Sequence, residues 1–155
     1  MSGLWRKPRD HGLMTVIREE AYGDIVEYCR GELPFEACGL LAGTVREGNY
    51  CIEKVYCLSN GDKRTDHFSM LPEEQFQAVR DMRERGYELL GNFHSHPRTD
   101  PLPSNEDIRL AQDSNLVYLI LSLKEEKPDL KAYRIDREGN VISDPIVQMS
   151  FLSGR

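Results

Sequence analysis

The chain has 155 residues and contains no apolar stretch approaching the roughly 20 residues that a membrane-spanning helix requires. A secretory signal is also missing, because the basic segment Met1 to Arg9 is followed by Asp10, His11 and Gly12 rather than by an apolar run. Positive charge is scarce: the formal net charge is -6 at pH 7, whereas a nucleic-acid-binding surface needs a basic excess. We therefore expect a cytoplasmic protein that binds neither a membrane nor a nucleic acid.

Several familiar metal and redox motifs are absent as well. The four cysteines, Cys29, Cys38, Cys51 and Cys57, form no C-x-x-C pair, so neither a zinc knuckle nor a redox motif is indicated. We expect small buried thiols in a reducing compartment, and a structural disulfide stays open. Neither H-E-x-x-H nor the zinc deaminase signature, H-x-E with P-C-x-x-C, occurs. A general base for any metal site must therefore come from a distant part of the chain.

The composition is that of an ordinary globular domain, with 39% hydrophobic and 30% charged residues. A chain of this length suits one domain with a core of its own. We expect residues 1–13 to form a flexible N-terminal tail and residues 14–150 to form a single domain.

Helices and strands alternate along the predicted domain. Helices are expected at Glu19 to Arg30, between Pro72 and Gly86, and directly after Ser104. Strands are expected at Cys38 to Val45, Tyr50 to Leu58, Glu88 to His96, Leu116 to Leu123, Lys131 to Ile135 and Val141 to Val147. The alternation in the second strand slips near Glu53 and Lys54, which indicates a bulge. This order predicts an α/β fold with a mixed β-sheet flanked by helices.

The segment after Phe93 carries candidate metal ligands. His94 and His96 are two residues apart on a predicted strand, so both imidazoles project from one face and can reach one ion. Asp107 lies in the first turn of the next predicted helix, where a proline-stiffened loop can bring it back as a third ligand. Two histidines, a carboxylate and an open position for water form a catalytic zinc set.

Each of these residues also has a purely structural explanation. An H-x-H pair on a strand is more often structural than ligating, and Ser104 with Asp107 reads as a helix capping box. The best candidate for the general base is Glu36, which directly precedes an apolar strand and could point into a cleft beside the metal. We expect His11 and His67 to be surface or loop histidines.

Taken together, these residues resemble the JAMM, or MPN+, zinc metalloprotease family. The family pattern is an upstream glutamate, then H-x-H-P, six residues, S, two residues and D. Glu36, the segment His94-Ser95-His96-Pro97, Ser104 and Asp107 meet this spacing in full. The segments at 34–41 and 90–93 are also similar to the family, and the resemblance extends over roughly residues 15 to 147.

The resemblance implies a cytidine-deaminase-like α/β fold, the JAMM/MPN fold, with one bound zinc ion. It implies that His94, His96 and Asp107 hold the zinc. Glu36 would take a proton from the attacking water and deliver it to the leaving amine. Ser104 would donate a hydrogen bond to the oxyanion of the tetrahedral intermediate, and it could still cap the helix.

The resemblance also implies a class of substrate. Family members hydrolyse amide or isopeptide bonds after the C-terminal tail of ubiquitin-like proteins. Residues 98–103 lack the Gly- and Trp-containing run of eukaryotic deubiquitinating members, and we see no room for large insertions. The chain is more similar to compact bacterial and archaeal members, which are associated with ubiquitin-like sulfur-carrier proteins ending in Gly-Gly and with release of an added amino acid, notably cysteine.

Two other functions stay open. The domain could be a non-catalytic module that binds a ubiquitin-like partner, or a peptidase with an unrelated peptide target. Another divalent ion would satisfy the same ligands less typically than zinc. A homodimer is compatible with the sequence, which does not define the oligomeric state.

Overall fold

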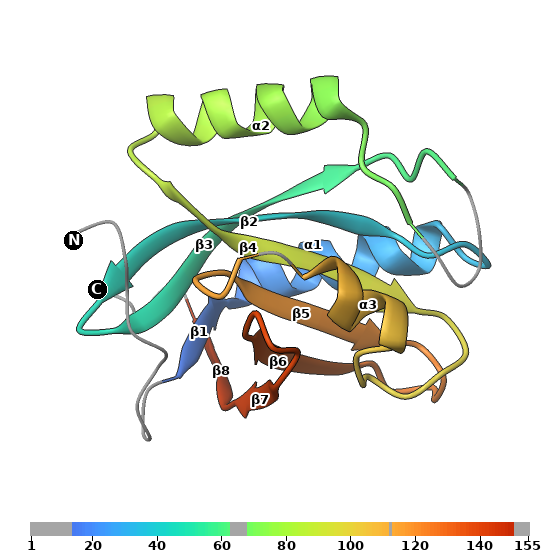
Figure 1. Cartoon of the computed structure of the whole chain (residues 1–155). Coiled ribbons are helices and arrows are strands. Elements are labelled where there is room, and N and C mark those ends of the chain that lie inside the picture. Colours follow the sequence, from blue (N-terminus) through green and yellow to red (C-terminus); the bar gives the residue numbers. More distant parts are fainter. Residues whose placement is uncertain (1–13, 63–67, 112, 151–155) are drawn as a thin grey trace.

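The structure is a computed structural model, which describes residues 14–62, 68–111 and 113–150. Within these residues, one eight-stranded sheet has the order β7-β6-β5-β4-β2-β3-β1-β8 (Figure 1). Its strands are β1 (Thr15–Arg18), β2 (Cys38–Arg46), β3 (Asn49–Leu58), β4 (Glu88–His96), β5 (Val117–Ser122), β6 (Asp129–Ile135), β7 (Val141–Asp144) and β8 (Ile146–Met149). The helices are α1 (Glu19–Gly31), α2 (Pro72–Glu84) and α3 (Asn105–Leu110). The predicted tail, with His11, and His67 lie outside the described residues.

Strand β2 shows why the sheet is covered on both faces. Its nearly continuous apolar run is typical of a strand without a solvated face. Leu41 packs in the core beneath α1, whereas Leu40 and Ala42 pack with Ala78 and Met82 of α2. The two helices therefore lie on opposite faces of the sheet, as Figure 1 shows. The predicted class, a mixed β-sheet flanked by helices, is confirmed.

Most predicted elements agree with the structure, and the bulge is confirmed. Ala42 pairs with Lys54 and the next residue, Gly43, pairs with Ile52, so Glu53 is the extra residue. Strand β1 was not predicted, because four residues directly before a helix give little periodic signal. It lies between β3 and β8 and runs parallel to both.

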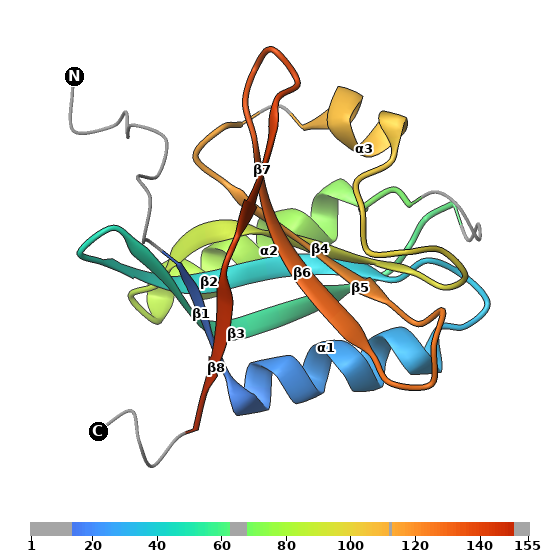
Figure 2. The same cartoon turned by 90° about the horizontal axis from the view of Figure 1, so that it is seen from below.

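The prediction of one strand from Val141 to Val147 is wrong. Pro145 divides it into β7, which pairs with β6, and β8, which pairs with β1. These are the two outer strands of the sheet, and Figure 2 shows them running end to end. The sheet must therefore curl until its two edges meet at a single residue.

A contact between distant strands shows the same curl. Strands β6 and β3 have three strands between them, so in a flat sheet they would lie about 19 Å apart. The Arg134 guanidinium of β6 nevertheless lies 4.8 Å from the centre of the Tyr50 ring of β3. Arg134 also donates a hydrogen bond to the Ser114 carbonyl, and the Tyr50 hydroxyl donates one to the Asn115 carbonyl. We call these four residues the closing cluster.

Strand β4 lies at the centre of the sheet, with β2 on one side and β5 on the other. Gly91 permits the close pairing of β4 with β5, because a Cβ at this position would come within 1.8 Å of the Val117 carbonyl oxygen of β5. A larger residue would force the two parallel strands apart. The C-terminal end of β4 is thereby held between two neighbours, and His94 and His96 lie at this end.

Two further expectations concern the cysteines and membranes. All four cysteines lie in the described part of the chain and are free thiols. Cys29 and Cys38 are buried as predicted, but Cys57 is exposed, so that expectation is wrong for this residue. None of the helices in the described ranges has the length and apolarity needed to cross a bilayer.

Candidate metal centre

The two histidines and the aspartate converge on one point. His94 Nε2 lies 3.2 Å from His96 Nε2 and 3.1 Å from Asp107 Oδ2. The third side of this triangle, from His96 Nε2 to Asp107 Oδ2, is 3.3 Å. Both histidines are buried and Asp107 is half-buried. Asp107 follows His94 by thirteen positions in the sequence, so the loop between β4 and α3 produces the triangle.

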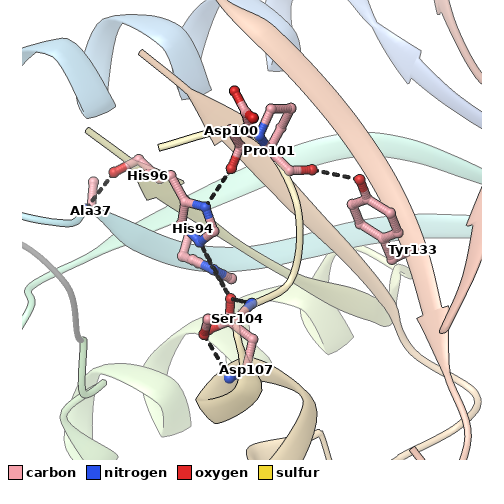
Figure 3. A network of polar contacts seen from close by, with 9 residues as sticks. Ala37, His94, His96, Asp100, Pro101, Ser104, Asp107 and Tyr133 are labelled. Carbon is pink, nitrogen blue, oxygen red and sulfur yellow. Dashed lines mark hydrogen bonds and ion pairs between the residues drawn. The ribbon is translucent and has the colours of Figure 1, made fainter. Parts of the chain in front are cut away.

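Hydrogen bonds hold this loop in place (Figure 3). His96 Nδ1 donates to the Asp100 carbonyl at 2.8 Å, which leaves the Nε2 of a neutral ring without a proton. Ser122 of β5 donates to the Thr99 carbonyl, and Tyr133 of β6 donates to the Pro101 carbonyl. The loop is therefore attached to both strands that follow it in the sheet.

Asp107 is oriented by the start of α3. The Asp107 backbone N–H donates to Ser104 Oγ at 3.0 Å, and the Ser104 backbone N–H donates to Asp107 Oδ2 at 2.9 Å. This is the predicted capping box. Burial raises the pKa of Asp107, but its hydrogen bonds to His94 and His96 lower the pKa far more, well below the ordinary value. The carboxylate is therefore ionised at neutral pH.

The triangle consists of groups that offer electron pairs. A neutral His96 and an ionised Asp107 both present lone pairs towards the same point, and either a proton on an imidazole or a metal ion at that point makes the arrangement favourable. A tetrahedral ion with bonds of about 2.0–2.1 Å places its ligand atoms about 3.3–3.4 Å apart. The observed separations of 3.1 to 3.3 Å fit such an ion, and the three side chains can hold a metal.

His94 has a different environment from His96. The ring of Phe68 stacks on the His94 ring, with centroids 4.8 Å apart and planes 24° apart. His94 Nδ1 is buried and accepts or donates no hydrogen bond among the residues that the structure describes. The stacked Phe68 ring therefore contributes to the orientation of this imidazole.

Glu36 lies on the β2 side of the centre. Cys38 pairs with His94, and Ser95 N–H donates to the Ala37 carbonyl, so the antiparallel register places Glu36 opposite His96. Residues directly opposite in an antiparallel pair share a face of the sheet. Glu36 is only 5% exposed, and its negative charge contributes to raising the pKa of His96.

Two bonds fix the chain around Glu36. Asn60 Nδ2 donates to the Glu36 carbonyl at 2.9 Å, and the Ala37 backbone N–H donates to Ser95 Oγ at 2.8 Å. Ser95 stands between the two histidines, so the segment that carries Glu36 is attached directly to the strand that carries the ligands. Ser104 is exposed at the opposite, α3 side of the centre.

A pocket of about 180 Å³ adjoins the centre, and sequence reasoning did not find it. His94 and Asp107 form one wall, and most of the remaining wall is apolar, including Tyr118, Ile120 and Ile135. Asn92 also lines it. The one available signal was the period of two along β4, which places Asn92 on the same face as His94.

The architecture and the site together define a class of protein. A curled mixed sheet whose central strand ends in H-x-H, with the third ligand on the next helix, is a JAB/MPN domain. Residues 18–136 match the family Prok-JAB, described as prokaryotic homologs of the JAB domain. The chain belongs to this family, and its resemblance to JAMM proteins is confirmed.

Similar proteins include named enzymes. The chain is 30% identical over 134 residues to the CysO-cysteine peptidase of Mycobacterium tuberculosis, covering 86% of this chain and 90% of that protein. It is 29% identical over 138 residues to the desampylase of Pyrococcus furiosus, covering 89% of this chain and 94% of that protein. The relatives therefore match nearly along their whole length.

Solved structures agree with the fold. The solution structure of a Desulfitobacterium hafniense protein has a TM-score of 0.82 and 43% identity, covering 88% of this chain and 94% of that one. A JAB1/MPN domain protein from Archaeoglobus fulgidus has a TM-score of 0.55 and 22% identity, covering 86% of this chain and 99% of that one. The second likeness concerns the fold alone.

Proposed function

We propose that the chain is a zinc-dependent hydrolase that cleaves the amide bond after the C-terminal Gly-Gly tail of a ubiquitin-like sulfur-carrier protein. The released amine is an amino acid, notably cysteine. The observation that carries this proposal is the triangle of His94 Nε2, His96 Nε2 and Asp107 Oδ2, with buried Glu36 opposite His96.

The donor set favours zinc. Two imidazole nitrogens and one carboxylate oxygen match a catalytic zinc site that leaves a position open, whereas magnesium and calcium prefer oxygen ligands. Zinc bound in such a site acts as a Lewis acid and makes water more acidic. His94, His96 and Asp107 are the residues that would hold it.

Glu36 is the proposed general base and acid. Its carboxylate takes a proton from the attacking water, whose oxygen bonds to the carbonyl carbon of the terminal glycine. The C–N bond then breaks, and Glu36 delivers the proton to the departing amine. Burial and the attachment of its backbone to Ser95 and Asn60 support this role, because they restrict where the carboxylate can lie.

Ser104 is the proposed oxyanion donor. Its Oγ accepts the capping bond from Asp107 N–H, which uses an oxygen lone pair and leaves the hydroxyl proton free to donate. Ser104 is exposed beside the ligands, so this proton can reach a substrate oxygen. The hydroxyl then stabilises negative charge on the tetrahedral intermediate without adding a charge of its own.

The relatives support the substrate class. The names of two that match almost end to end are CysO-cysteine peptidase and desampylase. A Gly-Gly tail also suits this centre, because glycine allows a backbone to approach an ion closely. The free thiols support a reducing location, and we propose that the protein acts in the cytoplasm.

The test pairs metal analysis with hydrolysis. A ubiquitin-like carrier extended by cysteine after its Gly-Gly tail is incubated with zinc-loaded wild type, Glu36→Gln and Glu32→Gln, and released cysteine is measured. We expect one equivalent of zinc in all three proteins. Turnover should fall by at least about 10²-fold in Glu36→Gln alone, since a general acid–base contributes about 10²–10⁴-fold.

The other outcomes separate the alternatives. Undiminished turnover in Glu36→Gln would refute the mechanism. Zinc binding with cleavage of unrelated peptides, but not of the carrier, would indicate a peptidase with another target. Carrier binding without zinc and without hydrolysis would indicate a non-catalytic module.

A further inference from the structure

Glu36 lies just before the paired part of β2. The first pairs of this strand are Cys38 with Leu58 of β3 and Cys38 with His94 of β4. Glu36 precedes Cys38 by two positions and is only 5% exposed. A buried backbone carbonyl needs a hydrogen-bond partner, and at this position the regular pairing with β3 does not supply one.

Asn60 supplies the partner with its side chain. If the antiparallel register of β2 and β3 continued by two residues, position 60 would lie opposite Glu36. The backbone of Asn60 instead forms an isolated bridge with Met70, and Asn60 Nδ2 donates a hydrogen bond to the Glu36 carbonyl at 2.9 Å. This bond takes the place of a bond between strands. Asn60 is 3% exposed, so bulk water has little access to it.

The same carboxamide holds a second segment of the chain. Asn60 Oδ1 accepts a hydrogen bond from the Ser69 backbone N–H at 3.0 Å. Phe68, whose ring stacks on the ring of His94, directly precedes Ser69. Asn60 therefore connects the carbonyl of Glu36 to the segment that contacts a metal ligand.

Glu36 is thus attached to the ligands from both sides. On the β4 side, the Ala37 N–H donates to Ser95 Oγ, and the Ser95 N–H donates to the Ala37 carbonyl. On the β3 side, the connection runs through Asn60. If only the β4 attachment remained, the backbone at Glu36 could rotate and carry the carboxylate away from the metal centre. A displacement of about 1 Å in a catalytic site can cost about 10²-fold in rate.

The chemistry of a carboxamide suits this position. Asn60 donates to one carbonyl and also accepts from the N–H groups of Ser69 and Asp62, the latter at 3.0 Å. An ionised aspartate of the same shape accepts but does not donate. Asn60→Asp therefore keeps an acceptor for both N–H groups and removes only the bond to Glu36.

We propose that Asn60 is a positioning residue for the general base: its bond to the Glu36 carbonyl fixes where the Glu36 carboxylate lies at the metal centre. This inference rests on the proposed function and adds to it a residue that acts through Glu36. Asn60 touches neither the metal ligands nor the scissile bond in this role.

The test compares the two ends of β3. Asn49→Asp is the matched control, because Asn49 begins the strand at the end away from Asn60 and its Oδ1 likewise accepts a backbone N–H, that of Met14. Zinc content, kcat and KM are measured with the carrier extended by cysteine. In Asn60→Asp we expect one equivalent of zinc, a kcat lowered by about 10–10²-fold and a KM within about threefold of wild type. Asn49→Asp should change none of the three.

A double-mutant cycle separates positioning from a general structural role. Glutamine at position 36 has no carboxylate to accept a proton, so its placement matters little for the residual turnover. Asn60→Asp added to Glu36→Gln should therefore lower kcat by less than about twofold. A structural role would lower kcat by the same factor in both backgrounds.

A second variant controls for charge and folding. Asn60→Asp introduces a buried charge, whereas Asn60→Ala introduces none. Asn60→Ala should show at least the same loss of kcat, and this loss should also disappear in the Glu36→Gln background. Thermal melts and metal analysis establish that each variant is folded and loaded with zinc.

The remaining outcomes distinguish this inference from the proposed function. An unchanged kcat in both Asn60 variants overturns the inference while cleavage continues, and so does an equal loss in both backgrounds. Loss of zinc or of a cooperative melt in both variants also overturns it, because Asn60 would then serve the metal or the fold. Undiminished turnover in Glu36→Gln alone refutes the proposed mechanism itself, and with it the role of Asn60.

Discussion

Two groups of polar side chains are buried in this sheet, and they differ in what they lack. The metal centre contains His94, His96 and Asp107, which converge on one point and include no side chain with a permanent positive charge. The closing cluster contains the Arg134 guanidinium, which stacks on Tyr50 and bonds to the Ser114 carbonyl. The first group must take up a cation, either a proton or a metal ion, whereas the second contains one.

The metal centre and the closing cluster also differ in their surroundings. The metal centre borders a pocket and an exposed Ser104, so a substrate can reach it. The closing cluster connects β6 and β3 across the curl, with both Arg134 and Tyr50 about 95% buried. Buried polar side chains alone therefore do not identify a functional site. The metal centre differs from the closing cluster because it has no permanent positive charge and because a pocket adjoins it.

Removing a ligand should give the largest effect and sharpen this contrast. His96→Ala leaves two ligands, and we expect bound zinc to fall from one equivalent to none and hydrolysis to drop by more than about 10³-fold. Metal analysis and cysteine release measure both. Full zinc occupancy in this variant would show that the triangle is not the metal site.

Acidity should act on the metal centre and spare the closing cluster. Burial lowers the pKa of His96, but its bonds to Asp107 and Asp100 and the charge of Asp107 outweigh this effect, so the pKa is raised. Protons therefore compete with zinc for His96 up to a higher pH than they would at an ordinary histidine. Zinc affinity should fall about tenfold per pH unit below that pKa.

The metal-free protein should show the opposite sign. Because the pKa of His96 is higher in the folded state, the protonated ring stabilises the fold below about pH 6.5, and this contribution is lost as pH rises through the raised value. Thermal melts from pH 6 to 9, with chelator and with zinc, test both signs. His96→Ala, the control, should lack the trend of the metal-free protein.

A smaller effect should come from the closing cluster. Tyr50→Phe keeps the ring under Arg134 but removes the hydrogen bond to the Asn115 carbonyl, so we expect a loss of about 1–2 kcal/mol in unfolding free energy. Zinc stoichiometry should stay at one. Urea denaturation measures the change, with Tyr22→Phe as the control. Loss of zinc in Tyr50→Phe would show that the metal centre depends on the closing cluster.

The smallest effect concerns thiols beneath the metal centre. Cys38 pairs with His94 across the sheet, and burial raises the pKa of Cys29 and Cys38 to about 12. Burial also raises the pKa of Cys57, to about 11, but Cys57 is exposed, so iodoacetamide at pH 8 should alkylate it before these two and leave zinc binding unchanged. Mass spectrometry of the peptides gives the order. Early labelling of Cys38 would show that the sheet opens at the centre.

Local patterns in the sequence were sufficient for the elements around the metal centre. The helix period of Ala21, Ile25 and Cys29 predicted α1, and all three are buried. The H-x-H spacing and the capping residues predicted that His94, His96 and Asp107 would meet, because Asp107 follows His94 by only thirteen positions, across a proline-rich loop.

Long-range pairing could not be predicted in the same way. Strand β1 is defined by its neighbours β3 and β8, and the division at Pro145 depends on which edge each half joins. Phe68 gave no local signal and Asn92 only the period of two along β4, because their importance comes from the His94 ring and from the pocket. These features exist only once distant segments pack together.

The joint at Pro145 has a consequence for the order of folding. Strand β8 pairs with β1, Thr15 with Ile146. Among the strand pairs of the described residues, this pair joins the residues that are farthest apart in the sequence. On the ribosome, β1 has no β8 to pair with until residues 146–149 have emerged. The residues of the metal centre and their β2, β4 and β5 supports are synthesised earlier, so the site can assemble before the sheet closes.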